Sequence, residues 1–253
     1  MIFNRNYLHI NSYRKEFPEQ GLEMFNLTAN KGDIHQFPAG CIPFHWHSEL
    51  EVFVLLDGHV QVNIRDSTIY LNAGEGCFIN AGVLHSFNVV DDLPCQYRSF
   101  VFDPGIVGGA PGSIFDVNYV RPIINSDVPY LVFSNDSDNA VYFEQFDLAF
   151  RACKEELEGY EFCVRGALSN ILLFLSKKTL FPFRKIASVQ EMRLKQILEW
   201  INTNIEKEIQ LNDIAVVANV CPRECQRIFS KYIHCSPMEY IRRQRMFVAA
   251  GLL

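Results

Sequence analysis

Short apolar runs separated by turn-forming residues fill much of the first half of the chain. Between residues 22 and 103 the runs hold mostly β-branched and aromatic residues, which is typical of strands. They read LEMFNLTA, EVFVLL, HVQVNIRD, TIYLN, CFIN, SFNVV and YRSFVFD. Many short strands without helices between them favour a sandwich or barrel. Asp57 and Gly58, between EVFVLL and HVQVNIRD, predict a β-hairpin because both residues tolerate positive φ.

Helical spacing replaces the strand pattern after the polar stretch at residues 135–139. The apolar positions form two stripes, which we expect to be two paired helices divided at Gly159. The first stripe is Val141, Phe143, Phe146, Ala149, Phe150 and Cys153, and the second is Val164, Leu168, Ile171, Leu172 and Leu175. Such stripes usually pack in a core. Because these are unusually aromatic, part of their surface is also a candidate for self-association into a homodimer.

The last part of the chain has the spacing of a helix-turn-helix. A short helix is predicted over residues 212–218, with the small residue Ala215 where two helices would cross. A turn follows at Asn219, since Asn tolerates the left-handed conformation, and a second helix begins with Pro222. The second helix would bury Cys225, Ile228 and Phe229. FPFRK at 181–185 reads as the linker that precedes this region.

The net charge of the chain changes sign at the same linker. Residues 1–183 carry 12 Lys and Arg against 22 Asp and Glu, a net charge of −10, whereas residues 184–253 carry 11 against 7, a net charge of +4. A basic C-terminal part on an acidic body indicates nucleic acid as a partner. The chain has no run of 18 apolar residues and no signal peptide, so we expect a cytoplasmic protein without membrane contact. The 8 cysteines are irregularly spaced and are expected to be reduced thiols.

Two groups of residues are candidates for the chemistry. On the second helix of the pair, Arg223, Gln226 and Arg227 could contact base edges, because Arg and Gln carry forked donors. Lys231, Arg242 and Arg243 suit phosphates. The alternative is an ordinary solvated helix face with a Glu224–Arg227 ion pair.

The other group lies in GCIPFHWHSELEVFVLLDG. His45 and His47 alternate along a strand and so share a face; with Glu51 and the later His85 they form a ligand set suited to iron, manganese or zinc. Trp46 and Phe53 would wall a small-molecule pocket. A pocket without metal, and a metal-dependent enzyme such as a dioxygenase or isomerase, are the alternatives.

The histidine segment resembles the cupin superfamily. The resemblance covers roughly residues 30–103 and rests on Gly40, His45, His47, Glu51, Gly58, Gly76, Gly82, His85 and Asn88. It implies a small β-barrel, and metal-binding cupins use the residues that match His45, His47, Glu51 and His85. Asn80 stands where cupins usually have proline.

The C-terminal part resembles the first half of the DNA-binding domain of the AraC/XylS transcriptional regulators. The resemblance covers roughly residues 190–253 and rests on L..IA, P..CQR.F, SP.EYI and R....A..LL. It implies that Arg223, Gln226 and Arg227 lie on a recognition helix. Members continue into a second helix-turn-helix, so we expect a chain truncated after RRQRMFVAAGLL or a natural short form with weak DNA binding of its own. Cys221 replaces the usual N-cap serine, and His234 replaces the usual glycine after the recognition helix.

We therefore predict an α+β protein with three parts: a cupin β-barrel that binds an effector at 1–134, a helical dimerisation segment at 135–183, and an all-α helix-turn-helix region at 184–253. The predicted function is a DNA-binding transcription regulator that senses a small molecule, without catalysis. A truncated dimerisation module with weak DNA binding is a further alternative.

Overall fold

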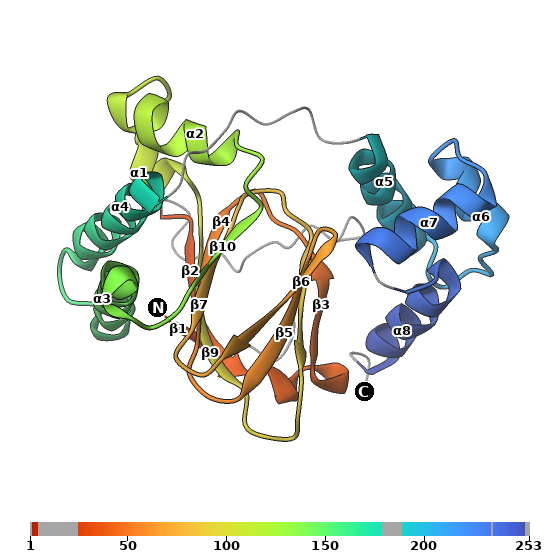
Figure 1. Cartoon of the computed structure of the whole chain (residues 1–253), viewed down its shortest axis with the longest axis horizontal. Helices are drawn as coiled ribbons and strands as arrows, with labels where there is room; N and C mark the ends of the chain where they lie inside the picture. Colours follow the sequence, from red (N-terminus) through yellow and green to blue (C-terminus); the bar gives the residue numbers. More distant parts are fainter. Residues whose placement is uncertain (1, 5–24, 179–188, 234, 251–253) are drawn as a thin grey trace.

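The computed structural model describes residues 2–4, 25–178, 189–233 and 235–250. The predicted linker at 181–185 and His234 lie outside the described residues. A β domain occupies the centre, with α3 and α4 on one side and α5 to α8 on the other (Figure 1). The predicted α+β class, with strands first and the helix-turn-helix region last, is confirmed.

The strands form two sheets that face each other. The six-stranded sheet has the order β1-β2-β9-β4-β7-β10, and the four-stranded sheet has the order β3-β8-β5-β6. The larger sheet contains β1 (Ile2–Asn4), β2 (Leu27–Asp33), β4 (Leu50–Leu55), β7 (Gly76–Ile79), β9 (Gln96–Phe102) and β10 (Tyr130–Phe133). The smaller contains β3 (Cys41–His45), β5 (His59–Ile64), β6 (Ser67–Asn72) and β8 (His85–Val89). Most of these strands overlap the predicted runs; β1, β3 and β10 do not, although His45 was expected on a strand.

The hairpin predicted at Asp57 and Gly58 is wrong. β4 pairs with β7 and β9, whereas β5 pairs with β6 and β8, so this turn carries the chain from one sheet to the other. Gly58 has a φ of 80°, and a Cβ there would lie 2.4 Å from Pro94 O, so glycine is required for both reasons. The tight turn within the small sheet is instead at Arg65 and Asp66, with Arg65 at a φ of 54°.

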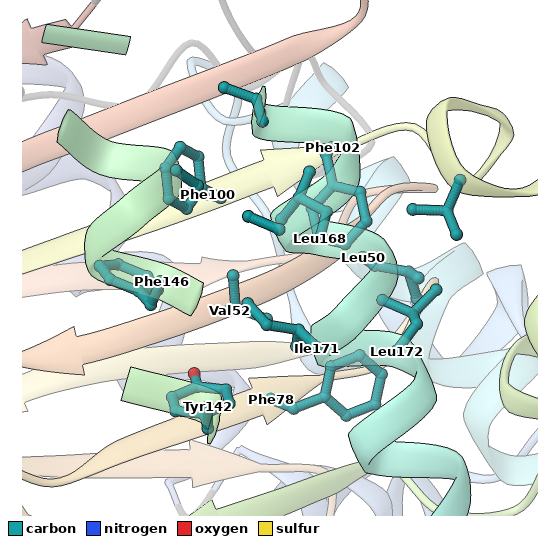
Figure 2. Close-up of a cluster of buried hydrophobic side chains, with 14 of the residues drawn as sticks. Leu50, Val52, Phe78, Phe100, Phe102, Tyr142, Phe146, Leu168, Ile171 and Leu172 are labelled. Atoms are coloured by element: carbon teal, nitrogen blue, oxygen red, sulfur yellow. The ribbon is translucent and has the colours of Figure 1, made fainter. Parts of the chain in front are cut away.

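α3 (Ala140–Glu155) and α4 (Tyr160–Lys178) cover the outer face of the six-stranded sheet, where their apolar side chains meet Val52, Phe78 and Phe100 (Figure 2). All five predicted positions of α4 are buried. On α3 the stripe is shifted, because Tyr142 is buried while Val141 is 43% exposed. Three short helical segments not predicted from the sequence precede β10: α1 (Gly105–Gly108), the π-helix η3 (Asp116–Val120) and α2 (Arg121–Ile124). The described residues also form 3-10 turns at η1 (Ile34–Gln36), η2 (Pro38–Gly40) and η4 (Ser137–Asn139).

The C-terminal helices form a separate core around Ile197, Ile214 and Phe229. They are α5 (Val189–Thr203), α6 (Leu211–Val217), α7 (Pro222–Tyr232) and α8 (Pro237–Ala250). The predicted turn is confirmed, with Asn219 at a φ of 52° and α7 beginning at Pro222. None of the helices in the described part of the chain is long and apolar enough to cross a membrane.

Candidate functional site

Strand β4 places one carboxylate between the two sheets. Side chains alternate along a strand, so Leu50, Val52 and Val54 face α3 and α4, while Glu51 and Phe53 face the opposite way, toward the four-stranded sheet. Glu51 is only 5% exposed. A carboxylate at this depth must find polar or charged partners, because burying it alone would cost several kcal/mol or more.

The three predicted histidines reach the same place from the smaller sheet. His45 on β3 and His85 on β8 are paired across the two strands, and their ring centroids lie 4.1 Å apart. His47, two residues beyond His45, adds a third ring 5.2 Å from that of His85. One ligand atom from each histidine and one from Glu51 all lie within 4.8 Å of one another, and all four side chains are buried. The structure therefore brings all four predicted ligands together.

Each of the three imidazoles is oriented by a backbone carbonyl. The distances from Nδ1 are 2.8 Å for His45 to Pro43 O, 3.0 Å for His47 to Glu49 O, and 2.9 Å for His85 to Val83 O. A carbonyl only accepts hydrogen bonds, so Nδ1 carries the proton in each ring. In the neutral imidazole, Nε2 then keeps its lone pair. These contacts fix the tautomer and ring orientation as they do in metal sites.

The ionisation of the cluster follows from burial and from these contacts. Burial alone would raise the pKa of the Glu51 carboxyl, but hydrogen bonding and charge attraction from His47 and His85 hold that pKa well below its usual value. Burial, together with repulsion from His85 and His47, lowers the pKa of His45. The site thus contains an ionised carboxylate beside at least one neutral imidazole.

This arrangement fits a divalent metal ion. Oε2 of Glu51 lies 3.3 Å from Nε2 of His47 and 3.2 Å from Nε2 of His85. Each ring therefore either takes a second proton and donates it to Glu51 or, when neutral, turns a lone pair toward a carboxylate oxygen. Nε2 of His85 is also buried without a well-aligned hydrogen bond. A cation bound to these atoms would remove both conflicts. Ligand atoms about 2.1 Å from one ion lie about 3 Å or more apart, which agrees with the observed spacing.

The two aromatic residues predicted to wall the site lie on different sides of it. Phe53 is fully buried and stacks on Phe87, with ring centroids 4.6 Å apart; Phe87 in turn meets the ring of His85 edge-on at 5.7 Å. Phe53 and Phe87 therefore form an apolar floor next to the histidines. Trp46 is not brought together with them, because its ring lies under Lys195 of α5, with Nζ 4.5 Å from the centroid.

The residues predicted to contact DNA are exposed on α7 and α8. They are Arg223, Gln226, Arg227 and Lys231 on α7, and Arg242 and Arg243 on α8. Arg227 pairs with Glu224 at 2.8 Å, as the alternative interpretation of this face expected, and Arg243 pairs with Glu239. The ion pair between Lys231 and Asp66, at 3.6 Å, was not predictable from local patterns, because Asp66 is a turn residue of the β domain.

Comparison with known proteins matches both parts of the chain. Residues 36–159 match the family described as the AraC-like ligand binding domain. The uncharacterized HTH-type transcriptional regulator YdeC of Bacillus subtilis is 25% identical over 235 residues, covering 92% of this chain and 80% of YdeC. The HTH-type transcriptional regulator GbdR of Pseudomonas aeruginosa is 35% identical over 72 residues, covering 28% of this chain and 20% of GbdR.

Solved structures with a similar chain path include two proteins with low sequence identity. An apo ToxT structure from Vibrio cholerae superposes with a TM-score of 0.42 at 10% identity, covering 85% of this chain and 96% of ToxT. The AraC-like transcriptional activator CuxR superposes with a TM-score of 0.35 at 12% identity, covering 80% of this chain and 67% of CuxR. With an AraC-like ligand binding domain at residues 36–159 and a transcriptional regulator as a relative over most of its length, the chain is a transcriptional regulator with an AraC-type ligand-binding domain.

Proposed function

We propose that this regulator binds DNA through the exposed face of α7 and senses a small ligand at the site formed by His45, His47, Glu51 and His85, with a divalent metal ion as part of that site. The observation that carries the metal is the orientation of the three imidazoles: each gives its Nδ1 proton to a carbonyl. Nε2 of His47 and of His85 lies within 3.3 Å of one Glu51 oxygen, and one ligand atom of His45 lies within 4.8 Å of the other three ligand atoms.

The residues of the site would determine which ligand binds. His45, His47, Glu51 and His85 would hold the ion, and the ion would supply a positive charge for an oxygen-bearing ligand. Phe53 and Phe87 would exclude water on one side of the site. A metal-dependent cupin enzyme could use the same four residues. We favour sensing because the helix-turn-helix gives an enzyme no advantage, and because the relatives are transcriptional regulators.

The metal is tested by binding. Purified protein freed of metal is titrated with Mn²⁺ or Zn²⁺, and the bound ion is counted by mass spectrometry. We expect one ion per chain, and at 100 times the dissociation constant a stabilisation of about 2.7 kcal/mol. Glu51→Gln should lose both effects, whereas the control Glu161→Gln, on α4, should keep them. Equal binding by the two variants would contradict the site, and turnover of a substrate would favour the enzyme.

DNA binding is tested by selecting duplexes from a random pool and measuring affinity at several salt concentrations. Arg227→Ala should weaken the selected duplex about ten-fold and relax the base preference, because Arg reads guanine edges. Lys231→Ala should weaken all duplexes alike and reduce the salt dependence. Arg165→Ala removes the same charge from the exposed surface of α4 and serves as the control. If Arg165→Ala and Arg227→Ala change DNA affinity equally, α7 is not the helix that contacts DNA.

We also infer that the protein is cytoplasmic, since regulators of this kind act on DNA, and that it forms a homodimer. The surface of α3 and α4 and the loop between them exposes Leu148, Leu157 and Phe162, the last at 79%. Leu148 and Leu157 line the same surface pocket, and exposed apolar residues that lie close together are typical of interfaces. Sedimentation equilibrium should give a dimer that Phe162→Asp disrupts. A monomer at every concentration would contradict it.

A further inference from the structure

The segment that carries two of the histidines has a second face. His45 and His47 point into the site, and the alternate residues Phe44 and Trp46 pack against the core of the C-terminal helices. The same division occurs next to His85, because Leu84 is buried in the core formed by α5, α6 and α7. The site and the DNA-binding region are therefore in contact with opposite faces of the same short segments.

α5 is the helix that makes this contact. Nζ of Lys195 lies over the Trp46 ring and donates a hydrogen bond to Gly82 O at 2.8 Å. Gly82 in turn donates its N–H to His47 O at 2.7 Å. Figure 1 shows α5 to α8 beside the four-stranded sheet, on the side of β3 and β6. A change in the backbone around His47 would therefore reach Lys195 through Trp46 and Gly82.

The last turn of α7 meets the β domain as well. Nζ of Lys231 lies 3.6 Å from the carboxylate of Asp66 in the β5–β6 turn, and both side chains are about half exposed. Lys231 lies on the same stripe of α7 as Arg223 and Arg227, since the three are spaced four residues apart. A duplex along this stripe would bring phosphates next to Asp66. The Asp66 carboxylate pairs with the Lys231 ammonium, so it competes with a phosphate for that charge. Its own negative charge would also repel the phosphates of the duplex.

We propose that this docked arrangement is autoinhibitory and that a divalent ion at the four-residue site stabilises it. The ligand atoms are already at coordination spacing while α5 packs on Trp46, so an ion would bind the docked state better than a state in which this segment has moved. A ligand shifts an equilibrium only by its differential affinity for the two states. The inference rests on the proposed function, both its metal site and its DNA binding, and names how the first regulates the second.

The test measures affinity for a random-sequence duplex of fixed length by fluorescence anisotropy, with and without Mn²⁺. Mn²⁺ should weaken binding by the wild-type chain about five-fold or more. Glu51→Gln should show no Mn²⁺ effect, which also controls for ion binding to the duplex. Trp46→Ala should bind tightly in both conditions. Unchanged or tighter binding by the wild type with Mn²⁺ would overturn the inference.

A charge-matched pair of variants isolates the contact at α7. Asp66→Lys and Asp92→Lys change the net charge equally, and Asp92 is an exposed residue of the β8–β9 loop. Both should gain affinity for DNA through general attraction. Asp66→Lys should gain about two- to five-fold more, the range expected for a surface ion pair, and should respond less to Mn²⁺. Equal behaviour of the two variants would overturn the autoinhibitory role of Asp66.

Hydrogen–deuterium exchange separates this inference from the proposed function. Mn²⁺ should slow exchange in peptides from α5, α7 and the β5–β6 turn, in the absence of DNA. If the ion binds, DNA affinity is measurable, and neither exchange nor affinity responds, the inference fails while DNA binding stands. If exchange slows but no variant binds any duplex, the proposed function fails and the inhibitory role is overturned with it.

Discussion

The two helical regions on opposite sides of the β domain are attached to it in different ways. α3 and α4 share one continuous apolar core with the six-stranded sheet, which includes Phe100, Phe146 and Leu172. α5 to α8 have a core of their own, and they reach the β domain through Leu84, Phe44 and Trp46 and a few polar contacts. The first region must fold with the sheet, whereas the second can detach without exposing the sheet's main core.

The chemistry of the two attachments agrees with this difference. On the α3 side, the ring of Phe100 meets Phe146 at 5.1 Å and Phe150 at 5.7 Å, and all three rings are buried. On the α5 side, Lys195 lies over Trp46. A partly exposed cation–π contact contributes about 0.5–1 kcal/mol, far less than a buried aromatic cluster. A contact of this strength suits a surface that must open and close.

The largest effect is expected on the α3 side. Phe146→Ala removes a buried ring and should lower the free energy of unfolding by about 3–5 kcal/mol, measured by urea denaturation. The loss should appear in the transition of the β domain, because α3 and the sheet share one core. Leu93→Ala, at a site 54% exposed in the β domain, is the control and should stay within about 0.5 kcal/mol of the wild type. A small effect of Phe146→Ala would remove the contrast between the two regions.

Leu198→Ala probes the other core. This α5 residue is buried among the C-terminal helices, so its truncation should cost about 2–5 kcal/mol. We expect the loss to be confined to α5–α8: amides of these helices should exchange faster while those of β4 stay protected, by hydrogen–deuterium exchange. Equal deprotection of β4 would show that the two regions unfold as one unit.

Two surface ion pairs give the smallest effect and the sharpest comparison. Asp147→Asn breaks the pair with Arg98, 3.3 Å apart, and Asp66→Asn breaks the pair with Lys231. Each pair contributes at most about 1 kcal/mol. Asp147→Asn should lower the stability of the β domain slightly. Asp66→Asn should leave that stability unchanged and only loosen α7, as thermal unfolding at low and high salt would show. A measurable loss from Asp66→Asn in the β domain would contradict a detachable region.

The sequence predicted which segments form strands and helices better than it predicted which elements those segments pack against. Local patterns identified most strands, the helix-turn-helix and the four clustered side chains, because alternation and turn chemistry are local. They failed at Asp57 and Gly58, since a turn signal does not say whether the next strand joins the same sheet. They also failed for Val141 and Tyr142, where two adjacent apolar residues leave the buried face of the helix undetermined.

For the site, alternation indicated that His45 and His47 share a face but not what covers the opposite one. The pattern therefore predicts Trp46 beside the ligands, whereas in the structure its ring lies under Lys195. The carbonyl contacts of the three histidines depend on backbone positions in three dimensions, and the sequence contains no sign of them. The same holds for the pairing of Lys231 with Asp66, which joins two distant segments.

Tyr142 determines where the chain can be divided for expression. Its hydroxyl accepts the N–H of Phe53 at 3.1 Å and lies 3.0 Å from Phe53 O and 2.8 Å from Cys77 O, so a side chain of α3 completes the seam between β4 and β7. A recombinant fragment ending at residue 134 would lack this hydroxyl and would present the bare apolar face of the sheet to solvent. A ligand-binding fragment suitable for crystallisation or for use as a biosensor should therefore extend through Lys178.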